Sequence, residues 1–246
     1  MALWYALISV IIVSLLSLLG AFFLLLRREV FEKFITYTLA FSSGVLLGSA
    51  FLDLIPESVA ILSRDTYTLV LVGIITFFCV EKLLQWHHHV EGDHNDEEHK
   101  RKTFAYMSLV GDGVHNFVDG VVIGASYLVS IPIGLTTTFA VIAHEIPHEL
   151  SDFTVLIYGG LNTKRALFLN FVTALTAVAG TIIVFIISTR ITPIAHYMIP
   201  FAAGNFIYIA ASDLIPELHK KRHMGTSIVQ VILLIAGVVT TARLVQ

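Results

Sequence analysis

Two groups of His, Asp, Glu and Asn residues have the spacing and the chemistry of a metal-binding site. The first has the i, i+3, i+4, i+7 spacing that places side chains on one face of a helix, and it consists of Asp112, His115, Asn116 and Asp119. The second has two neighbouring columns of residues at a spacing of four, and it consists of His144, Glu145, His148, Glu149 and Asp152. Imidazole beside carboxylate suits Zn²⁺ first, with Fe²⁺, Mn²⁺ and Cd²⁺ as alternatives.

Both groups lie inside long apolar stretches, at residues 103–129 and 133–159, which contain no Lys or Arg. An ionisable side chain in the middle of a membrane span costs roughly 2.5–3.5 kcal/mol on insertion scales. Asp119, Glu145 and Glu149 would together cost on the order of 10 kcal/mol if they faced lipid. We therefore expect them to face the protein interior, where a bound cation relieves their mutual repulsion.

The elements that position these groups are membrane-spanning helices. Of the 246 residues 56% are hydrophobic and 13% charged, with a mean hydropathy of +0.83, whereas soluble domains carry roughly 25% charged residues. Apolar runs predict eight spans, at about 2–26, 33–58, 66–85, 103–129, 133–159, 164–188, 194–218 and 226–245. The first is expected to be a retained span rather than a signal peptide. The single cysteine, Cys79, is expected to pack in the interior.

The distribution of Lys and Arg predicts the orientation. With eight spans the connections alternate between two sides, and twelve of the fifteen basic residues fall on one side. Since basic connections stay in the cytoplasm, both termini are predicted to lie outside. The net charge of −3 offers no basic surface for a nucleic acid, so we expect none as a partner.

An internal repeat links two of the spans. Residues 41–57 (FSSGVLLGSAFLDLIPE) and 201–217 (FAAGNFIYIAASDLIPE) are 160 residues apart and identical at eight of seventeen positions. Their spans would cross in opposite directions, as in inverted-repeat transporters. We therefore predict an all-α integral membrane protein, a single domain over residues 1–246, with eight transmembrane helices in a 3+2+3 inverted-repeat arrangement. The repeat-related Asp53 and Asp213 are candidate stations on an ion pathway, or solvated residues at helix ends.

Two further features could take part in transport. Pro147 has no N–H, so the carbonyl of Ala143 loses its helical donor and can face a cation or water, or the proline bend is tolerated without a role in ion binding. Asn170 and Thr173 in the sixth span are expected to face the core.

The connection between the third and fourth spans, residues 86–102, is rich in histidine. It holds His87, His88, His89, His94 and His99 and is predicted to be cytoplasmic. It could capture metal that leaves the pore or sense its concentration, or it could be a solvated loop without such a role.

The motifs HNFVDG (residues 115–120) and HEIPHELSDF (144–153) resemble those of the ZIP (Zrt/Irt-like) family of divalent-metal transporters, most closely the subfamily with HNFxDG and HExPHExGD. Ser151 replaces the usual Gly, and Ala143 stands where some relatives have Cys. The resemblance implies a primary site made by His115, Asp119 and His148. It also implies a second site to which Asn116, Glu145 and His148 contribute, and a looser link of His144, Glu149 and Asp152 to metal.

The predicted function is therefore transport of a divalent metal, Zn²⁺ first, toward the cytoplasm. The metal is the substrate, no cofactor is expected, and the ion is predicted to leave past Asp53 toward the His-rich connection. The expected partners are the lipid bilayer and a second copy of the chain in a homodimer, and the expected location is the inner membrane of a prokaryotic cell.

Two other functions fit parts of the sequence. The segment HEIPH also satisfies the HExxH pattern of zinc proteases, which makes an intramembrane protease the alternative, although Pro147 interrupts its helix. A metal-sensing receptor would explain the His-rich connection but not the buried acids of the two central spans.

Overall fold

The protein is all-helical in a computed structural model that describes residues 1–20, 28–90, 97–188, 194–220 and 224–245. Its helices are α1 (Ala2–Leu15), α3 (Arg28–Gly48), α4 (Ile55–Leu62), α5 (Asp65–Val90), α6 (Glu97–Val129), α7 (Ile131–Tyr158), α8 (Thr163–Ala174), α9 (Thr176–Ser188), α10 (Ile194–Tyr208), α11 (Ile215–His219) and α12 (Met224–Leu244). Three short segments continue some of them: the 3₁₀ turn η1 (Leu16–Leu18) and the π-helical turns η2 (Ser49–Leu54) and η3 (Ile209–Leu214).

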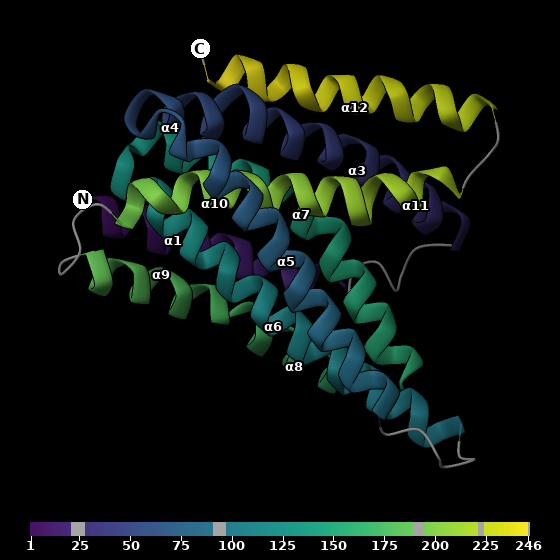
Figure 1. The fold of residues 1–246 in the computed structure, drawn as a ribbon. Coiled ribbons are helices and arrows are strands. Elements are labelled where there is room, and N and C mark those ends of the chain that lie inside the picture. The colour runs from purple at the N-terminus through teal and green to yellow at the C-terminus, as the bar shows by residue number, and fades with distance from the viewer. Residues whose placement is uncertain (21–27, 91–96, 189–193, 221–223, 246) are drawn as a thin grey trace.

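Within the described residues these segments form eight rods, each of which overlaps one of the eight predicted spans. The end of the first predicted span, at 21–26, lies outside the described residues. Four rods are long and apolar enough to cross a membrane: Glu29–Leu62, Thr163–Ser188, Ile194–His219 and Met224–Leu244. Ala2–Leu18 and Asp65–Val80 are shorter apolar helices. The other two rods, α6 and α7, are long but carry the polar groups described above. Both chain ends lie at the same end of the bundle (Figure 1).

The sequence repeat is also a structural repeat. Each copy contains a helix, then a π-helical turn, then a short helix with a proline in its first turn: α3, η2 and α4 in the first copy, and α10, η3 and α11 in the second. The two π-helical turns lie 160 residues apart, in register with the repeat. Such turns are rare and occur mostly at functional sites, so their recurrence supports a common role for the two copies.

Each copy also packs against its neighbour in the same way. A Cβ atom on Gly44 would lie 2.0 Å from the carbonyl oxygen of Leu234 in α12, and a Cβ on the repeat-related Gly204 would lie 2.2 Å from that of Val70 in α5. Only glycine allows backbones to approach so closely. Two fixed helix pairs result, α3 with α12 and α5 with α10.

The central helices α6 and α7 run antiparallel between these pairs. Near one end of α7, Thr138 contacts Tyr127 of α6, and near the other end Asp152 contacts Ser108. α6 also packs closely on α9, where a Cβ on Gly120 would lie 1.9 Å from the carbonyl oxygen of Ala177.

Two sequence expectations are corrected here. The connection predicted at residues 86–102 is shorter, because α5 continues to Val90 and α6 begins at Glu97. His94 lies outside the described residues, and only the backbone is described at His87, His88, His89 and His99. Cys79 is exposed on α5 instead of packing in the interior.

Candidate metal centre

Four side chains of α6 and α7 converge on one small volume in the middle of the bundle. One ligand atom from each of His115, Asp119, His144 and Glu145 lies within 4.8 Å of the others. His115 Nε2 is 3.1 Å from Glu145 Oε1, and His144 Nε2 is 3.1 Å from Asp119 Oδ2. The two Nε2 atoms are 3.3 Å apart. Two imidazoles and two carboxylates at this separation have the ligand types and the number of a four-coordinate zinc site.

The backbone of α7 orients His144. Its Nδ1 lies 3.0 Å from the carbonyl oxygen of Ala140, and a carbonyl can only accept a hydrogen bond. The proton therefore resides on Nδ1, which leaves the Nε2 lone pair directed at the cluster. The ring packs edge-on against Phe206 of the second repeat copy, with the ring centroids 6.0 Å apart. His144 is completely buried, whereas the side chain of His115 is 14% exposed.

His148 lies outside the four-residue cluster, in contrast to its role in the ligand set that the resemblance implies. Its ring stacks on His115, with a centroid distance of 4.8 Å, and its Nδ1 is 3.5 Å from Asp152 Oδ2. His144, one turn earlier on the same face, occupies the place expected for His148. Periodicity cannot distinguish two histidines one turn apart, because both belong to the same stripe.

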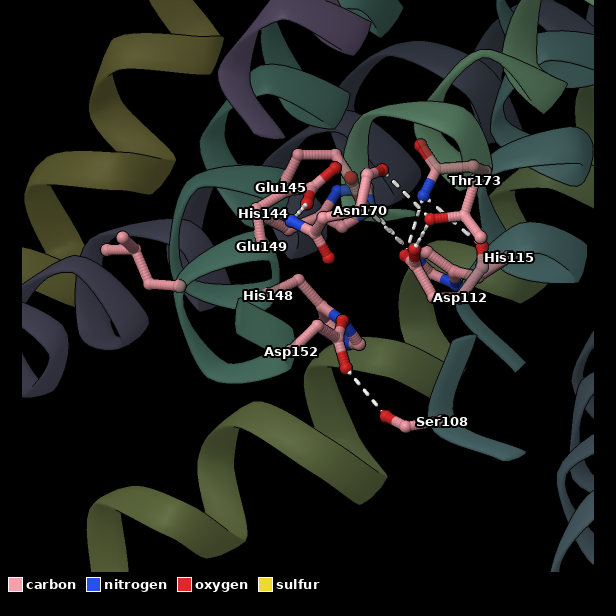
Figure 2. A network of polar contacts seen from close by, with 12 residues as sticks. Ser108, Asp112, His115, His144, Glu145, His148, Glu149, Asp152, Asn170 and Thr173 are labelled. Carbon is pink, nitrogen blue, oxygen red and sulfur yellow. Dashed lines mark hydrogen bonds and ion pairs between the residues drawn. The ribbon is translucent and has the colours of Figure 1, made fainter. Parts of the chain in front are cut away.

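The remaining polar residues of the two stripes form a second layer of contacts (Figure 2). Asp112 accepts hydrogen bonds from Thr173 and from Asn116. Glu149 accepts one from Asn170. Asn170 and Thr173 therefore face the core as expected. At the edge of this network Asp152 accepts a bond from Ser108, which sequence reasoning missed because serines in helices commonly bond to their own backbone.

Several buried oxygens in this region lack a hydrogen-bond donor within the described residues: Asn116 Oδ1, Asp119 Oδ1, Glu145 Oε2, Glu149 Oε1 and Asn170 Oδ1. A buried acceptor without a partner is costly, and a buried carboxylate is more so. The sequence from residue 103 to residue 163 contains no Lys or Arg that could neutralise them. The chemistry of this donor set fits a cation.

Of the two interpretations of the Pro147 interruption, the structure favours the one in which the Ala143 carbonyl is not an ion ligand. This carbonyl accepts a hydrogen bond from the Ser42 hydroxyl of α3. The interruption at Pro147 is therefore compensated by a residue of the first repeat copy. One feature of the sequence pointed to this hydrogen bond: position 42 is serine, whereas the corresponding position 202 of the second copy is alanine.

Asp53 and Asp213 lie at opposite ends of the central helices. Asp53 is buried and accepts a hydrogen bond from Thr136, near the start of α7. Asp213 lines an open pocket of about 350 Å³, together with His148, Asp152 and Glu217. Sixteen residues separate Thr136 from Asp152, which corresponds to about 24 Å of helix.

The predicted exit past Asp53 is therefore wrong. α6 begins at Glu97 directly after the His-rich connection, and its early residue Ser108 bonds to Asp152. The end of the bundle that carries the His-rich connection is thus the end of Asp213. The orientation predicted from Lys and Arg already places residue 53 at the outer end of its span, so an exit past Asp53 was inconsistent with that orientation.

Comparisons with known proteins agree with this chemistry. The family model described as ZIP Zinc transporter matches residues 1–102 and 87–244. The chain is 33% identical to zinc transporter ZIP13 of Pongo abelii over 233 residues, which cover 87% of this chain and 68% of that protein. It is 31% identical to zinc transporter zipt-7.1 of Caenorhabditis briggsae, over 83% of this chain and 69% of the relative. It is 27% identical to metal cation symporter ZIP14 of Mus musculus, over 88% and 60%.

Proposed function

Because the chain belongs to the ZIP family of zinc transporters, we propose that it carries a divalent metal ion, Zn²⁺ first, across a membrane toward the cytoplasm. The observation that carries this proposal is the buried cluster of His115, Asp119, His144 and Glu145, whose ligand atoms lie within 4.8 Å of one another. Its relatives are named as transporters and not as enzymes.

The first ion binds to this cluster, with His144 and not His148 as the second imidazole ligand. A second ion beside it would use Asn116 Oδ1 and Glu145 Oε2, two buried oxygens that have no donor in the part of the chain that the structure describes. His148 and Asp152 then lie between the cluster and the pocket, where they can accept the ion as it leaves. This binuclear arrangement retains the second site that the sequence resemblance implies.

The eight rods cross the membrane in a 3+2+3 arrangement, with both termini outside according to the distribution of Lys and Arg. In this orientation Asp53 lies at the outer end of the pathway and Asp213 at the cytoplasmic end. The metal enters past Asp53, binds at the cluster and leaves through the pocket that Asp213 lines. The structural repeat of α3–η2–α4 and α10–η3–α11 supports this assignment.

The protease alternative loses its structural basis. A catalytic HExxH zinc site needs both histidines on one ion, but His148 is not part of the group that contains His144. The relatives provide no support for it either.

Other predictions concern the surroundings of the transporter. Metal capture by the His-rich connection and pairing with a second copy of the chain remain predictions. The relatives named above come from animals, so they give no support for a prokaryotic inner membrane, although they support a membrane location.

The decisive experiment measures Zn²⁺ uptake into proteoliposomes. Asp119→Asn should abolish gradient-driven uptake, because it removes a buried anionic ligand without changing the size of the side chain. Asp65→Asn at the exposed start of α5 is the matched control and should transport normally. Uptake by Asp119→Asn equal to that of the unsubstituted chain would exclude this site. Binding without any flux would favour the metal-sensing receptor.

Protons should compete with the metal at this site. Imidazole must be neutral to bind Zn²⁺, so binding should weaken as the pH falls from about 7.5 to about 5. Isothermal titration of the purified protein with Zn²⁺ measures this dependence. Equal affinity at both pH values would exclude histidine as a ligand.

A further inference from the structure

The contact between α3 and α7 changes character along its length. Two hydrogen bonds join α7 to α3 and its continuation η2 on one side of the metal cluster, from Ser42 to the Ala143 carbonyl and from Thr136 to Asp53 of η2. We call this contact, of residues 42–53 with residues 136–143, the α3–α7 seam. Beyond Ser42 the same helices part around the pocket, which Leu39 lines on α3 and Pro147 and His148 line on α7. The helices are thus joined on one side of the cluster and separated on the other.

The hydrogen bond from Ser42 compensates for the helical hydrogen bond that Pro147 removes from α7. Pro147 leaves the Ala143 carbonyl without a helical donor, and an unsatisfied buried carbonyl is costly. Ser42 is completely buried and supplies the donor from another helix. The adjacent Ser43 is equally buried, but its hydroxyl bonds to Leu39 of its own helix. Only one of two neighbouring serines therefore links α3 to α7.

The seam differs from the other close contacts of α3. Gly44 packs against the backbone of α12 so closely that not even a Cβ atom would fit. Such a contact cannot slide without separating the helices. A hydrogen bond from a hydroxyl contributes only about 1 kcal/mol, so the seam can open at a modest cost.

We propose that Ser42 is a positioning residue for transport, which keeps the α3–α7 seam closed by holding the Ala143 carbonyl directly before His144 and Glu145. While this bond exists the cluster communicates with the pocket, and access from the Asp53 end requires the bond to break. The proposal rests on the proposed function for the identity of the cluster as the metal site. The state of the seam itself can be measured without metal.

A cysteine at position 140 reports on the seam. Ala140 is completely buried and lies on the same face of α7 as Thr136 and Ala143. The exposed Cys79 is first replaced by serine, and the rate of labelling of Ala140→Cys by a hydrophilic thiol reagent is then measured on the purified, metal-free protein. Ser42→Ala should raise this rate about tenfold, and Ser43→Ala should leave it unchanged. Equal rates in the two serine variants would overturn the proposal.

Pro147→Ala tests whether Ser42 acts through its hydrogen bond to the Ala143 carbonyl or only through packing. This substitution restores the N–H at position 147, which can bond to the Ala143 carbonyl and make Ser42 redundant. Ser42→Ala should therefore raise the labelling rate in the chain with Pro147 but not in the chain with Pro147→Ala. The same increase in both backgrounds would show that Ser42 acts only through packing, which would refute the proposal.

Uptake measurements distinguish the two proposals from each other. If labelling follows the expected pattern but the unsubstituted chain carries no Zn²⁺ into proteoliposomes, the proposed function fails and the role of Ser42 in the seam remains. If uptake depends on Asp119 but labelling is insensitive to Ser42→Ala, the inference fails and the proposed function remains.

Discussion

The two copies of the internal repeat have the same backbone and different surroundings. Each contains a helix, a π-helical turn and a proline-containing helix, and each ends in Asp-Leu-Ile-Pro-Glu. In the first copy Asp53 is buried against Thr136. In the second copy Asp213 lines an open pocket. The difference arises outside the repeat, because Thr136 of α7 covers Asp53, whereas Asp213 lies beside the pocket where α3 and α7 part.

This comparison teaches that one structural unit can support both a closed and an open end of a pathway. In an inverted repeat, exchange of the two environments would give the opposite state of the transporter. The close glycine contacts occur in both copies, whereas the hydrogen bonds of Ser42 and Thr136 join α7 to the first. The shared contacts therefore hold the scaffold, and those found in one copy define which end is closed.

The largest effects are expected at the cluster between the copies. His144→Ala removes an imidazole of the cluster and should reduce Zn²⁺ affinity about 100-fold or more, whereas His148→Ala should reduce it about tenfold, because His148 lies beside the cluster, stacked on His115. Isothermal titration of the two purified variants measures the difference. The reverse order would restore the ligand set that the sequence resemblance implies.

Equal effects in the two copies are expected for Gly44→Ala and Gly204→Ala. Each added Cβ would collide with a backbone carbonyl of the neighbouring helix, so both should destabilise the fold by about 3 kcal/mol or more. Gly113→Ala is the matched control, because the nearest atom to its Cβ would be Thr173 Cγ2 at an ordinary 3.7 Å. Thermal unfolding in detergent measures all three. A large effect in one copy alone would contradict the shared scaffold.

Opposite effects in the two copies are expected for accessibility. In a chain that carries Cys79→Ser, Asp213→Cys should react with a hydrophilic thiol reagent at least about tenfold faster than Asp53→Cys, because water in the pocket reaches only the former. Similar rates would show that the two ends are equally open in solution.

The smallest effect is expected at the closed end. Thr136→Val removes the donor to Asp53 and should lower the free energy of unfolding by about 1–2 kcal/mol. Thr137→Val should not lower it and is expected to raise it slightly, because the buried hydroxyl of Thr137 has no hydrogen-bond partner within the described residues. Chemical denaturation measures the pair, and equal losses in both would remove any special role of the Asp53 contact.

Much of the fold could be predicted from the sequence, because apolar length and helical periodicity act locally. The rods agree with the predicted spans, and the stripes of α6 and α7 do face each other. The repeat was evident from the seventeen-residue alignment of 41–57 with 201–217.

The rest depends on how helices meet, which local patterns do not encode. Whether His144 or His148 lies in the four-residue cluster depends on the register of α7 against α6. The donor for the Ala143 carbonyl comes from Ser42, about a hundred residues earlier in the chain, and one serine in an apolar helix looks like any other. The π-helical turns were also missed, since their sequence contains no proline or glycine to mark them.

The π-helical turns also change the direction in which the repeat-related aspartates point. A π turn takes one more residue per turn than an α-helix, and η2 and η3 have it at the same place in both copies. Asp53 and Asp213 lie inside these turns, so each is directed to another face of its rod than an uninterrupted α-helix would give it.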